Sequence, residues 1–407
     1  MPEATTGRMP PSSRDLSRKA AIVGVGDTDF HQDYKAARAK APGYELPTPE
    51  SLASTAFERA LADSGLRRED IDGLSVSFIY GGPNAASMAQ VLGLTPRHLI
   101  NNYGLLAGPL PGVCADIAAG KCDTVAMVYS AASRAIGRQY GGESYGGEGG
   151  GAPSSYYYHQ PWGWTSQAAH WALIWRYYQA TFGAVEEDLG SVAVQLRKNA
   201  LTNPNAVMQT PLSIQDYLQS RYIVRPLHLF DMCLVNDGAV CLIVRRADKA
   251  RDLPHKPVLV AGWGEGKVKG GKMDQMVRQR LRPQMQHAGG QAFEMAGVSL
   301  SNIQHFEAYD ASTMHLIDQV EGYGFVEPGQ GLEFCKSGEM AVGGALPVNT
   351  SGGMLSEAYM HGWSHVAEIT RQMRGEAGAR QIPGLEHSMF SLAQTDEAHP
   401  IIFERGA

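Results

Sequence analysis

Two short stretches of the 407-residue chain carry side chains that can move protons. EAYDAST contains Tyr309 followed by Asp310, and NTSGGMLSEAYMHGW contains Glu357, Tyr359 and His361. A phenol with a pKa near 10 is a poor base in water, but it is a capable acid and a good hydrogen-bond donor to an oxyanion. A neighbouring donor or a positive dipole end can lower that pKa and make the phenol a base. The two stretches therefore offer groups for an acid–base reaction.

Residue type alone does not select these positions. The chain has 17 tyrosines, and most tyrosines in a protein of this size pack in the core or at its rim. His361 lies close in sequence to Trp363 and His365, so a packing or capping role is also open. Gly352 and Gly353 either let the backbone approach a substrate or form a tight turn that needs a positive φ.

The cysteines form no recognisable metal or disulfide framework. They are odd in number, include no C-x-x-C pair and lie in apolar or mixed contexts: Cys114, Cys122, Cys233, Cys241 and Cys335. We therefore expect buried reduced thiols, no disulfide scaffold and no metal site.

Charge and hydropathy exclude two classes of protein. The net charge of −6 and the pI of about 6.1 supply no broad basic field, which argues against nucleic-acid binding. No apolar run approaches the roughly 20 residues needed to cross a bilayer. Residues 1–19 are polar and contain prolines, so we expect a flexible tail on a cytoplasmic protein with no membrane association.

An apolar strand that ends at glycines occurs twice, as AAIVGVGDTDF at 20–30 and PVLVAGWGEG at 257–266. A helix and a second strand follow each copy. The copies align at one constant separation through Gly65 and Gly297, Ile71 and Ile303, and Leu74 and Phe306. This internal duplication predicts a layered α/β fold with related halves at 20–256 and 257–407. It also predicts that the turn-to-helix junctions at 100–128 and 348–373 meet across a pseudo-twofold axis.

A long excursion at 137–230 separates the repeated parts, and we interpret it as an inserted loop region. Its first part, GRQYGGESYGGEGGGAPSSYYYHQPWGW, is rich in Gly, Ser, Tyr and Trp. It is compatible with a mobile surface linker and equally with a lid that covers an apolar substrate. The following SQAAHWALIWRYYQATFG has apolar residues at helical spacing, which favours core positions for Trp171, Ile174, Trp175 and Tyr178.

Three segments together resemble the thiolase superfamily: AAIVGVGDTDF, VNDGAVCLIV at 235–244, and NTSGGMLSEAYMHG. Within it the chain is most similar to the lipid-transfer-protein branch, which is related to the sterol-carrier thiolases. The resemblance extends from about residue 20 to the end of the sequence. It implies a duplicated five-layer αβαβα fold.

The chain departs from working thiolases at the positions that carry acyl transfer. The turn that holds the nucleophilic cysteine in thiolases reads Asn101-Asn102-Tyr103-Gly104 here, without sulfur. Cys114 follows about ten residues later, almost three helical turns away. Tyr359 stands where thiolases have a catalytic histidine, and Tyr309 where they have an asparagine that holds the thioester oxygen. No match exists for the second thiolase cysteine.

With these departures, the chain resembles the retro-aldolases of this branch. Those enzymes shorten steroid side chains carried as CoA thioesters and need no cysteine. The resemblance implies a carbon–carbon lyase that cleaves a β-hydroxyacyl-CoA. Tyr359 and Tyr309 are the expected catalytic pair, with the roles of base and oxyanion donor open. His361, Asp310 and Glu357 are proton-relay candidates, and Gly352, Gly353, Tyr103 and Gly104 are expected to contact substrate.

The same resemblance implies a homodimer joined by a small partner subunit with a zinc ribbon and an OB-fold. It implies no cofactor other than the CoA of the substrate. Two alternatives stay open at the level of sequence. One is a thiolase-type acyltransferase with an unconventional nucleophile, and the other is a non-catalytic scaffold that binds acyl-CoA.

Overall fold

A computed structural model describes residues 11–39, 43, 45–77, 82–102, 105–137, 166–268, 277–394 and 396–407. The strands of the first half are β1 (Ala20–Asp27), β2 (Gly73–Ser77), β3 (His98–Asn102), β4 (Thr124–Ala132) and β7 (Asp237–Arg246). Those of the second half are β8 (Val258–Trp263), β9 (Gly266–Lys267), β10 (His305–Ala308), β11 (His387–Gln394) and β12 (Glu397–Arg405). A separate hairpin is formed by β5 (Tyr222–Val224) and β6 (Leu227–His228).

The helices lie between these strands in sequence. The first half has α1 (Phe30–Ala39), α2 (Pro49–Ser64), α3 (Ala85–Val91), α4 (Pro109–Ala118), α6 (Gln167–Phe182), α7 (Glu186–Ala200) and α8 (Ile214–Gln219). The second half has α10 (Arg282–Ala296), α11 (Thr313–Gly322), α12 (Gly331–Lys336), α13 (Gly353–Ser356) and α14 (Trp363–Arg374).

The two halves repeat one sheet pattern. In the first half β2 is parallel to β4, β4 is antiparallel to β7, and β7 is antiparallel to β1. The second half repeats this pattern: β10 is parallel to β11, β11 is antiparallel to β12, and β12 is antiparallel to β8. A short antiparallel contact between β1 and β8 joins the halves into the strand order β10-β11-β12-β8-β1-β7-β4-β2-β3. The repeat confirms the duplication predicted from sequence.

The pairs that revealed the duplication occupy equivalent places. Gly65 ends α2 with φ 69°, and Gly297 ends α10 with φ 68°, the left-handed conformation that glycine adopts without steric cost. A 3₁₀ turn follows each, at Arg68–Asp70 and Leu300–Asn302, and leads into β2 and β10. The same cap, turn and strand therefore follow each outer helix.

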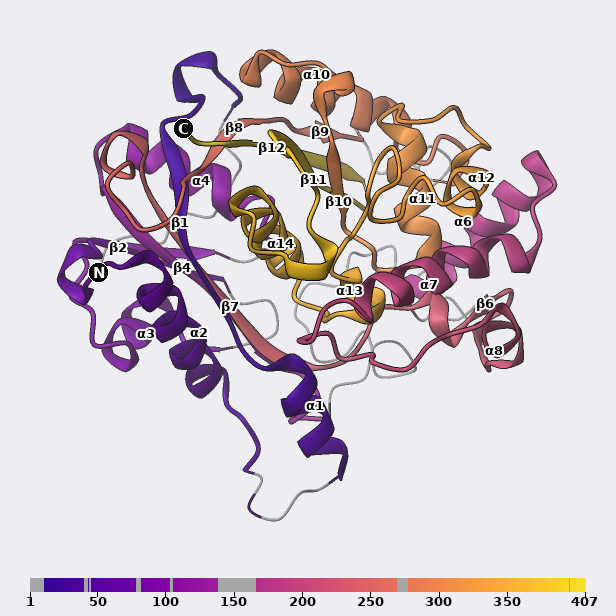
Figure 1. Cartoon of the computed structure of the whole chain (residues 1–407), viewed down its shortest axis with the longest axis horizontal. Coiled ribbons are helices and arrows are strands. Elements are labelled where there is room, and N and C mark those ends of the chain that lie inside the picture. The colour runs from indigo at the N-terminus through magenta and orange to yellow at the C-terminus, as the bar shows by residue number, and fades with distance from the viewer. Residues whose placement is uncertain are drawn as a thin grey trace.

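Helices and sheets alternate in five layers (Figure 1). Alternate residues of the central strands face different hydrophobic clusters, since Ala21 and Val23 pack with α2 whereas Ala20 and Ile22 pack with α4 and α14. On the second sheet, Ile401 faces the α4 and α14 layer, and Ile402 faces α10 and α11. Burial on both faces explains the nearly continuous apolar runs of these strands. The five-layer αβαβα fold is thus confirmed.

Two expectations need correction. Residues 166–230 are largely helical and contain α6, α7 and α8, so the inserted loop region does not extend through them. As the helical spacing predicted, Trp171, Ile174, Trp175 and Tyr178 are buried. The glycine-rich segment discussed as a lid lies almost entirely outside the described residues.

The second correction concerns the tail. Residues 11–19 form a 3₁₀ turn at Arg14–Leu16 and dock on the second half through Arg18, which binds Glu404. The described part of the expected flexible tail is therefore held against the body of the protein.

Candidate active site

The loop that begins at Asn349 is pinned to the end of β10. Asn349 adopts a positive φ of 46°, which asparagine tolerates better than most residues. Its Oδ1 accepts from the Ala308 backbone N–H at 2.7 Å, and its Nδ2 donates to the Ala308 carbonyl at 2.9 Å. This two-way bond places the loop directly beside the residues that follow β10, Tyr309 and Asp310.

Asp310 organises the next turn. It is fully buried, and its carboxylate accepts from the backbone N–H groups of Met354 at 2.9 Å and Leu355 at 3.3 Å. His365 Nε2 lies 3.0 Å from the same carboxylate. Burial opposes protonation of His365, but the bond to Asp310 outweighs it and raises the His365 pKa. Asp310 thus holds α13 and α14 together, and its expected part in proton relay stays a prediction.

Gly352 and Gly353 are required by this packing. Their φ values are 106° and 58°. A Cβ on Gly353 would lie 2.2 Å from Asp310 Oδ2, and a Cβ on Gly352 would lie 2.6 Å from the Ala200 Cβ. The tight-turn interpretation therefore explains both glycines, while contact with substrate stays a prediction.

Tyr359, further along the same loop, is held beside Asn236, the residue just before β7. Its backbone N–H donates to Asn236 Oδ1 at 2.7 Å, and its ring is half-buried against the His361 ring, with centroids 4.2 Å apart. His361 is buried with φ 50°, and its Nδ1 lies 2.6 Å from the Tyr129 hydroxyl. Tyr129 also stacks on Trp363. The structure thus brings Tyr359 and His361 together, as expected, and adds Tyr129.

Tyr129 was missed by the sequence reasoning. It is an aromatic residue in the apolar strand β4, and nothing in its neighbourhood resembles a catalytic motif. Only the fold places this strand beside the loop that carries His361.

Tyr309 is buried in the hydrophobic cluster between the sheets, against which Tyr359 also packs. Its backbone is fixed on both sides, because its N–H donates to the Ser391 carbonyl and its carbonyl accepts from Gln319 Nε2, both at 2.8 Å. The edge of its ring meets His315 at a centroid distance of 5.6 Å, and His315 stacks on Trp171 of α6. The helix after the glycine-rich segment therefore reaches the surroundings of Tyr309.

The two turn-to-helix junctions meet, as the duplication predicted. Leu106 lies just before α4, and His361 lies just before α14. The Leu106 N–H donates to the His361 carbonyl at 3.4 Å. Asn102, at the end of β3, donates from Nδ2 to Ser75 Oγ at 2.8 Å. Tyr103 and Gly104, expected to contact substrate, lie outside the described residues.

Glu357 introduces a buried acid behind this loop. Its carboxyl group accepts from Ser351 Oγ at 2.8 Å and from Asn203 Nδ2 at 2.9 Å. Burial, assisted by the nearby negative charge of Glu368, raises the Glu357 pKa to about 8. Burial acts against ionisation of Glu368 too, but the paired Arg380 guanidinium lowers the Glu368 pKa. Glu357 therefore ionises at a higher pH than Glu368.

The thiols are not placed for catalysis. All five cysteines are free, and Cys114 is buried in α4, where burial raises its pKa well above the ordinary range. Burial, with the charge of Asp310, raises the pKa of Cys233 to about 12. Among the described residues, no group of three His, Cys, Asp or Glu side chains could hold a metal ion. Within the same part of the chain, no helix is long and apolar enough to cross a membrane.

Comparison with known proteins decides the family. A family model described as thiolase C-terminal domain-like matches residues 267–395. A steroid side-chain-cleaving aldolase from Thermomonospora curvata is 34% identical over 88% of this chain and 91% of that protein. The 17-hydroxy-3-oxo-4-pregnene-20-carboxyl-CoA lyase of Mycobacterium tuberculosis is 33% identical over 92% of this chain and 96% of that one. This chain belongs to the aldolase branch of the thiolase superfamily.

A solved structure supports the same assignment. The Ltp2-ChsH2(DUF35) aldolase superposes with a TM-score of 0.83 and 29% identity, covering 96% of this chain and 98% of that one. As a member of this branch, the protein is a carbon–carbon lyase. Its thiolase scaffold therefore serves bond cleavage.

Proposed function

We propose that this aldolase cleaves a β-hydroxyacyl-CoA thioester on a steroid side chain and releases a ketone and a shorter acyl-CoA. The names of the two relatives, which are similar along nearly their whole length, support this substrate class. The observation that carries the proposed chemistry is the position of Tyr359, beside His361 on the loop where thiolases place their histidine.

The reaction needs three proton or charge transfers and no acyl-enzyme. A base takes the proton of the β-hydroxyl group, and that oxygen becomes the ketone carbonyl as the Cα–Cβ bond breaks. The electron pair of the broken bond moves into the thioester as an enolate, which a hydrogen-bond donor stabilises. An acid then protonates Cα and completes the acyl-CoA product. No cofactor beyond the CoA of the substrate enters this scheme.

Burial suggests how the two tyrosines divide these roles. Tyr359 is half-buried and contacts His361, which suits a group that exchanges protons with substrate and solvent. Tyr309 is 2% exposed, and its backbone is held by Ser391 and Gln319, which suits a fixed donor to the enolate oxygen. Under this proposal Tyr129 orients His361 through the 2.6 Å hydrogen bond.

Replacement of the hydroxyl groups tests the proposal. Tyr359→Phe should lower the turnover of a β-hydroxyacyl-CoA by about 10²–10⁴-fold, the usual range for general acid–base catalysis. Tyr309→Phe should lower turnover by about 10²–10³-fold, the range for loss of one oxyanion donor. Tyr177→Phe, on the half-exposed side of α6, is the matched control and should keep wild-type turnover. Wild-type turnover in Tyr359→Phe, with an unchanged melting temperature, would remove this residue from the mechanism.

The assembly is also part of the proposal. We expect a homodimer that binds a small partner with a zinc ribbon and an OB-fold, and the two-component name of the superposed Ltp2-ChsH2(DUF35) aldolase supports a heteromeric complex. Closed twofold dimers are the commonest symmetric assemblies. Analytical ultracentrifugation of the purified chain measures whether it forms the homodimer. A stable and fully active monomer would contradict both expectations.

A further inference from the structure

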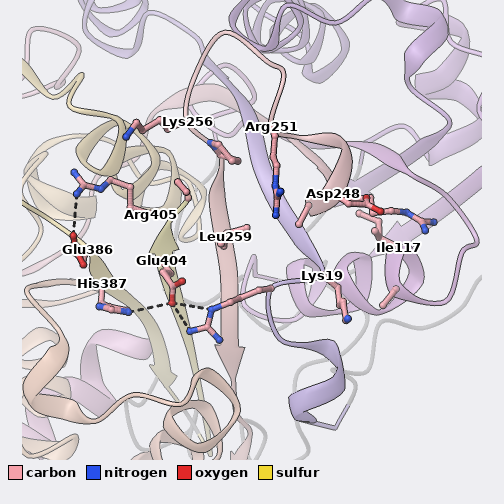
Figure 2. Close-up of a pocket in the computed structure, with 17 residues that line it drawn as sticks. Lys19, Ile117, Asp248, Arg251, Lys256, Leu259, Glu386, His387, Glu404 and Arg405 are labelled. Carbon is pink, nitrogen blue, oxygen red and sulfur yellow. Dashed lines mark hydrogen bonds and ion pairs between the residues drawn. The ribbon is translucent and has the colours of Figure 1, made fainter.

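A large groove opens at the seam between the two halves, away from the tyrosines. Its volume is about 1170 Å³, above the usual 300–1,000 Å³ of small-molecule sites. One wall comes from the segment before β1 and the turn after β7, and the other from the starts of β8 and β11 and the end of β12. Figure 2 shows Arg251 pointing into the space between the wall with Lys19 and the wall with Arg405.

The groove is separated from the candidate active site by the length of β7. Asn236, which binds the Tyr359 backbone, directly precedes this strand, whereas Arg246 at its other end lines the groove. Ten residues of antiparallel strand span about 30 Å at about 3.4 Å per residue. A ligand in the groove would therefore not touch Tyr359.

The groove is cationic on a protein that is acidic overall. Its lining includes six cationic side chains, three side-chain carboxylates and the last residue, Ala407, while the whole chain carries a net charge of −6. The cations are Arg18, Lys19, Arg246, Arg251, Lys256 and Arg405, and the carboxylates are Asp248, Glu386 and Glu404.

Ion pairs inside the groove neutralise only part of this charge. Glu404 binds Arg18, and Glu386 binds Arg405. Within the described part of the chain, Lys19, Arg251 and Lys256 make no ion pair, and all three are exposed. Three cations, drawn from both walls, therefore have no ion-pair partner among the described residues.

Apolar side chains also line the groove. Leu259 is partly exposed there, while Ile117 of α4 and Pro257 are buried. Bare phosphate would gain nothing from such a surface, whereas a ligand with both a flat apolar ring and several phosphates would use both parts.

We propose that this groove is a second binding site for a phosphorylated nucleoside that carries at least two phosphate groups. Arg251, Lys256 and Lys19 bind the phosphates, and the base lies against Leu259. The ligand contacts both halves of the duplicated fold, because Lys19 precedes β1 and Lys256 precedes β8. Free nucleotides and the nucleotide part of CoA share this chemistry.

Calorimetric titration of the full-length protein with ADP, CoA, pyrophosphate and adenosine tests the site. ADP should bind, adenosine should not bind measurably, and pyrophosphate should bind more weakly than ADP. Arg251→Gln and Lys256→Gln should each weaken ADP binding about tenfold or more, the loss expected for a hydrogen bond to a charged group. Raising the salt concentration should weaken it further, since these side chains are exposed. Arg176→Gln, an exposed cation on α6, is the matched control and should change nothing.

The remaining outcomes also decide the proposal. Equal ADP affinity in wild type and both groove variants would overturn the site, and pyrophosphate that binds as tightly as ADP would overturn the nucleoside part. CoA distinguishes the two ligand sources, because a groove that takes CoA adds a second binding event that Arg251→Gln removes. Turnover of Arg251→Gln should stay at the wild-type value, so failure of this site would leave the proposed lyase chemistry untouched.

Discussion

Gly353→Ala offers a quantitative test of how the active-site loop is built. Gly353 has φ 58°, and an added Cβ would lie 2.2 Å from Asp310 Oδ2 and 2.7 Å from Asn349 Nδ2. The left-handed conformation costs a residue with a side chain about 1–2 kcal/mol. Neither contact can be relieved cheaply, because both neighbours already hold the loop through buried hydrogen bonds.

The second contribution comes from Asp310. Moving its carboxylate weakens the bonds to the Met354 N–H and to His365, and hydrogen bonds to charged groups are worth about 1.5–3 kcal/mol each. We therefore expect Gly353→Ala to lower the free energy of unfolding by about 3–5 kcal/mol, a large part of the total for a typical domain. Turnover should fall as well, since Tyr359 follows on the same loop.

Gly375→Ala is the control that separates the two contributions. Gly375 ends α14 with φ 83°, but a Cβ there would meet no atom within 4 Å. This variant should lose only about 1–2 kcal/mol and keep full activity. Urea denaturation of both variants measures the difference. Equal losses would show that backbone conformation alone requires Gly353 and that the role assigned to Asp310 is wrong.

Three further changes probe the same region. Cys114→Ala should leave turnover almost untouched because this thiol is buried in α4, and an inactive protein would reopen the acyltransferase alternative. Tyr129→Phe should cost about 1–3 kcal/mol of unfolding free energy and reduce turnover, as it removes the bond to His361. Glu357 has a folded-state pKa raised from 4.5 to about 8, so its ionisation destabilises the fold as pH rises through that window, by at most about 1.4 kcal/mol per pH unit. Glu357→Gln keeps an acceptor oxygen for Asn203 Nδ2 and offers an N–H to Ser351 Oγ, but it cannot ionise. Chemical denaturation from pH 5 to 8 should therefore show a smaller loss of stability than in wild type, and identical slopes would refute this.

The sequence allowed the fold to be predicted because duplication leaves a local signature. Gly65 and Gly297 end equivalent helices in the same left-handed conformation, and each is followed by the same turn and strand. Such features depend on residues that are near each other in the chain. The region at 137–230 was interpreted as one inserted loop because its glycine-rich beginning outweighed the helical spacing that starts at residue 166.

Contacts between distant segments could not be predicted in this way. Tyr129 meets His361 only because β4 lies beside the loop before α14, and Arg18 meets Glu404 only because β1 and β12 both pair with β8. The role of Asp310 in holding the loop could not be predicted for a similar reason. Its bonds to backbone N–H groups exist only once the chain at Gly353 has turned.

These contacts also explain how one scaffold can hold different chemistry. The loop is fixed by Asn349 on Ala308, by Asp310 on Met354 and by Asn236 on Tyr359, and in each case the bond is made to a backbone atom. None of these three bonds depends on which side chain stands at position 359. Tyrosine at this position therefore leaves all three bonds in place, and under the proposed mechanism it changes which protons the loop transfers.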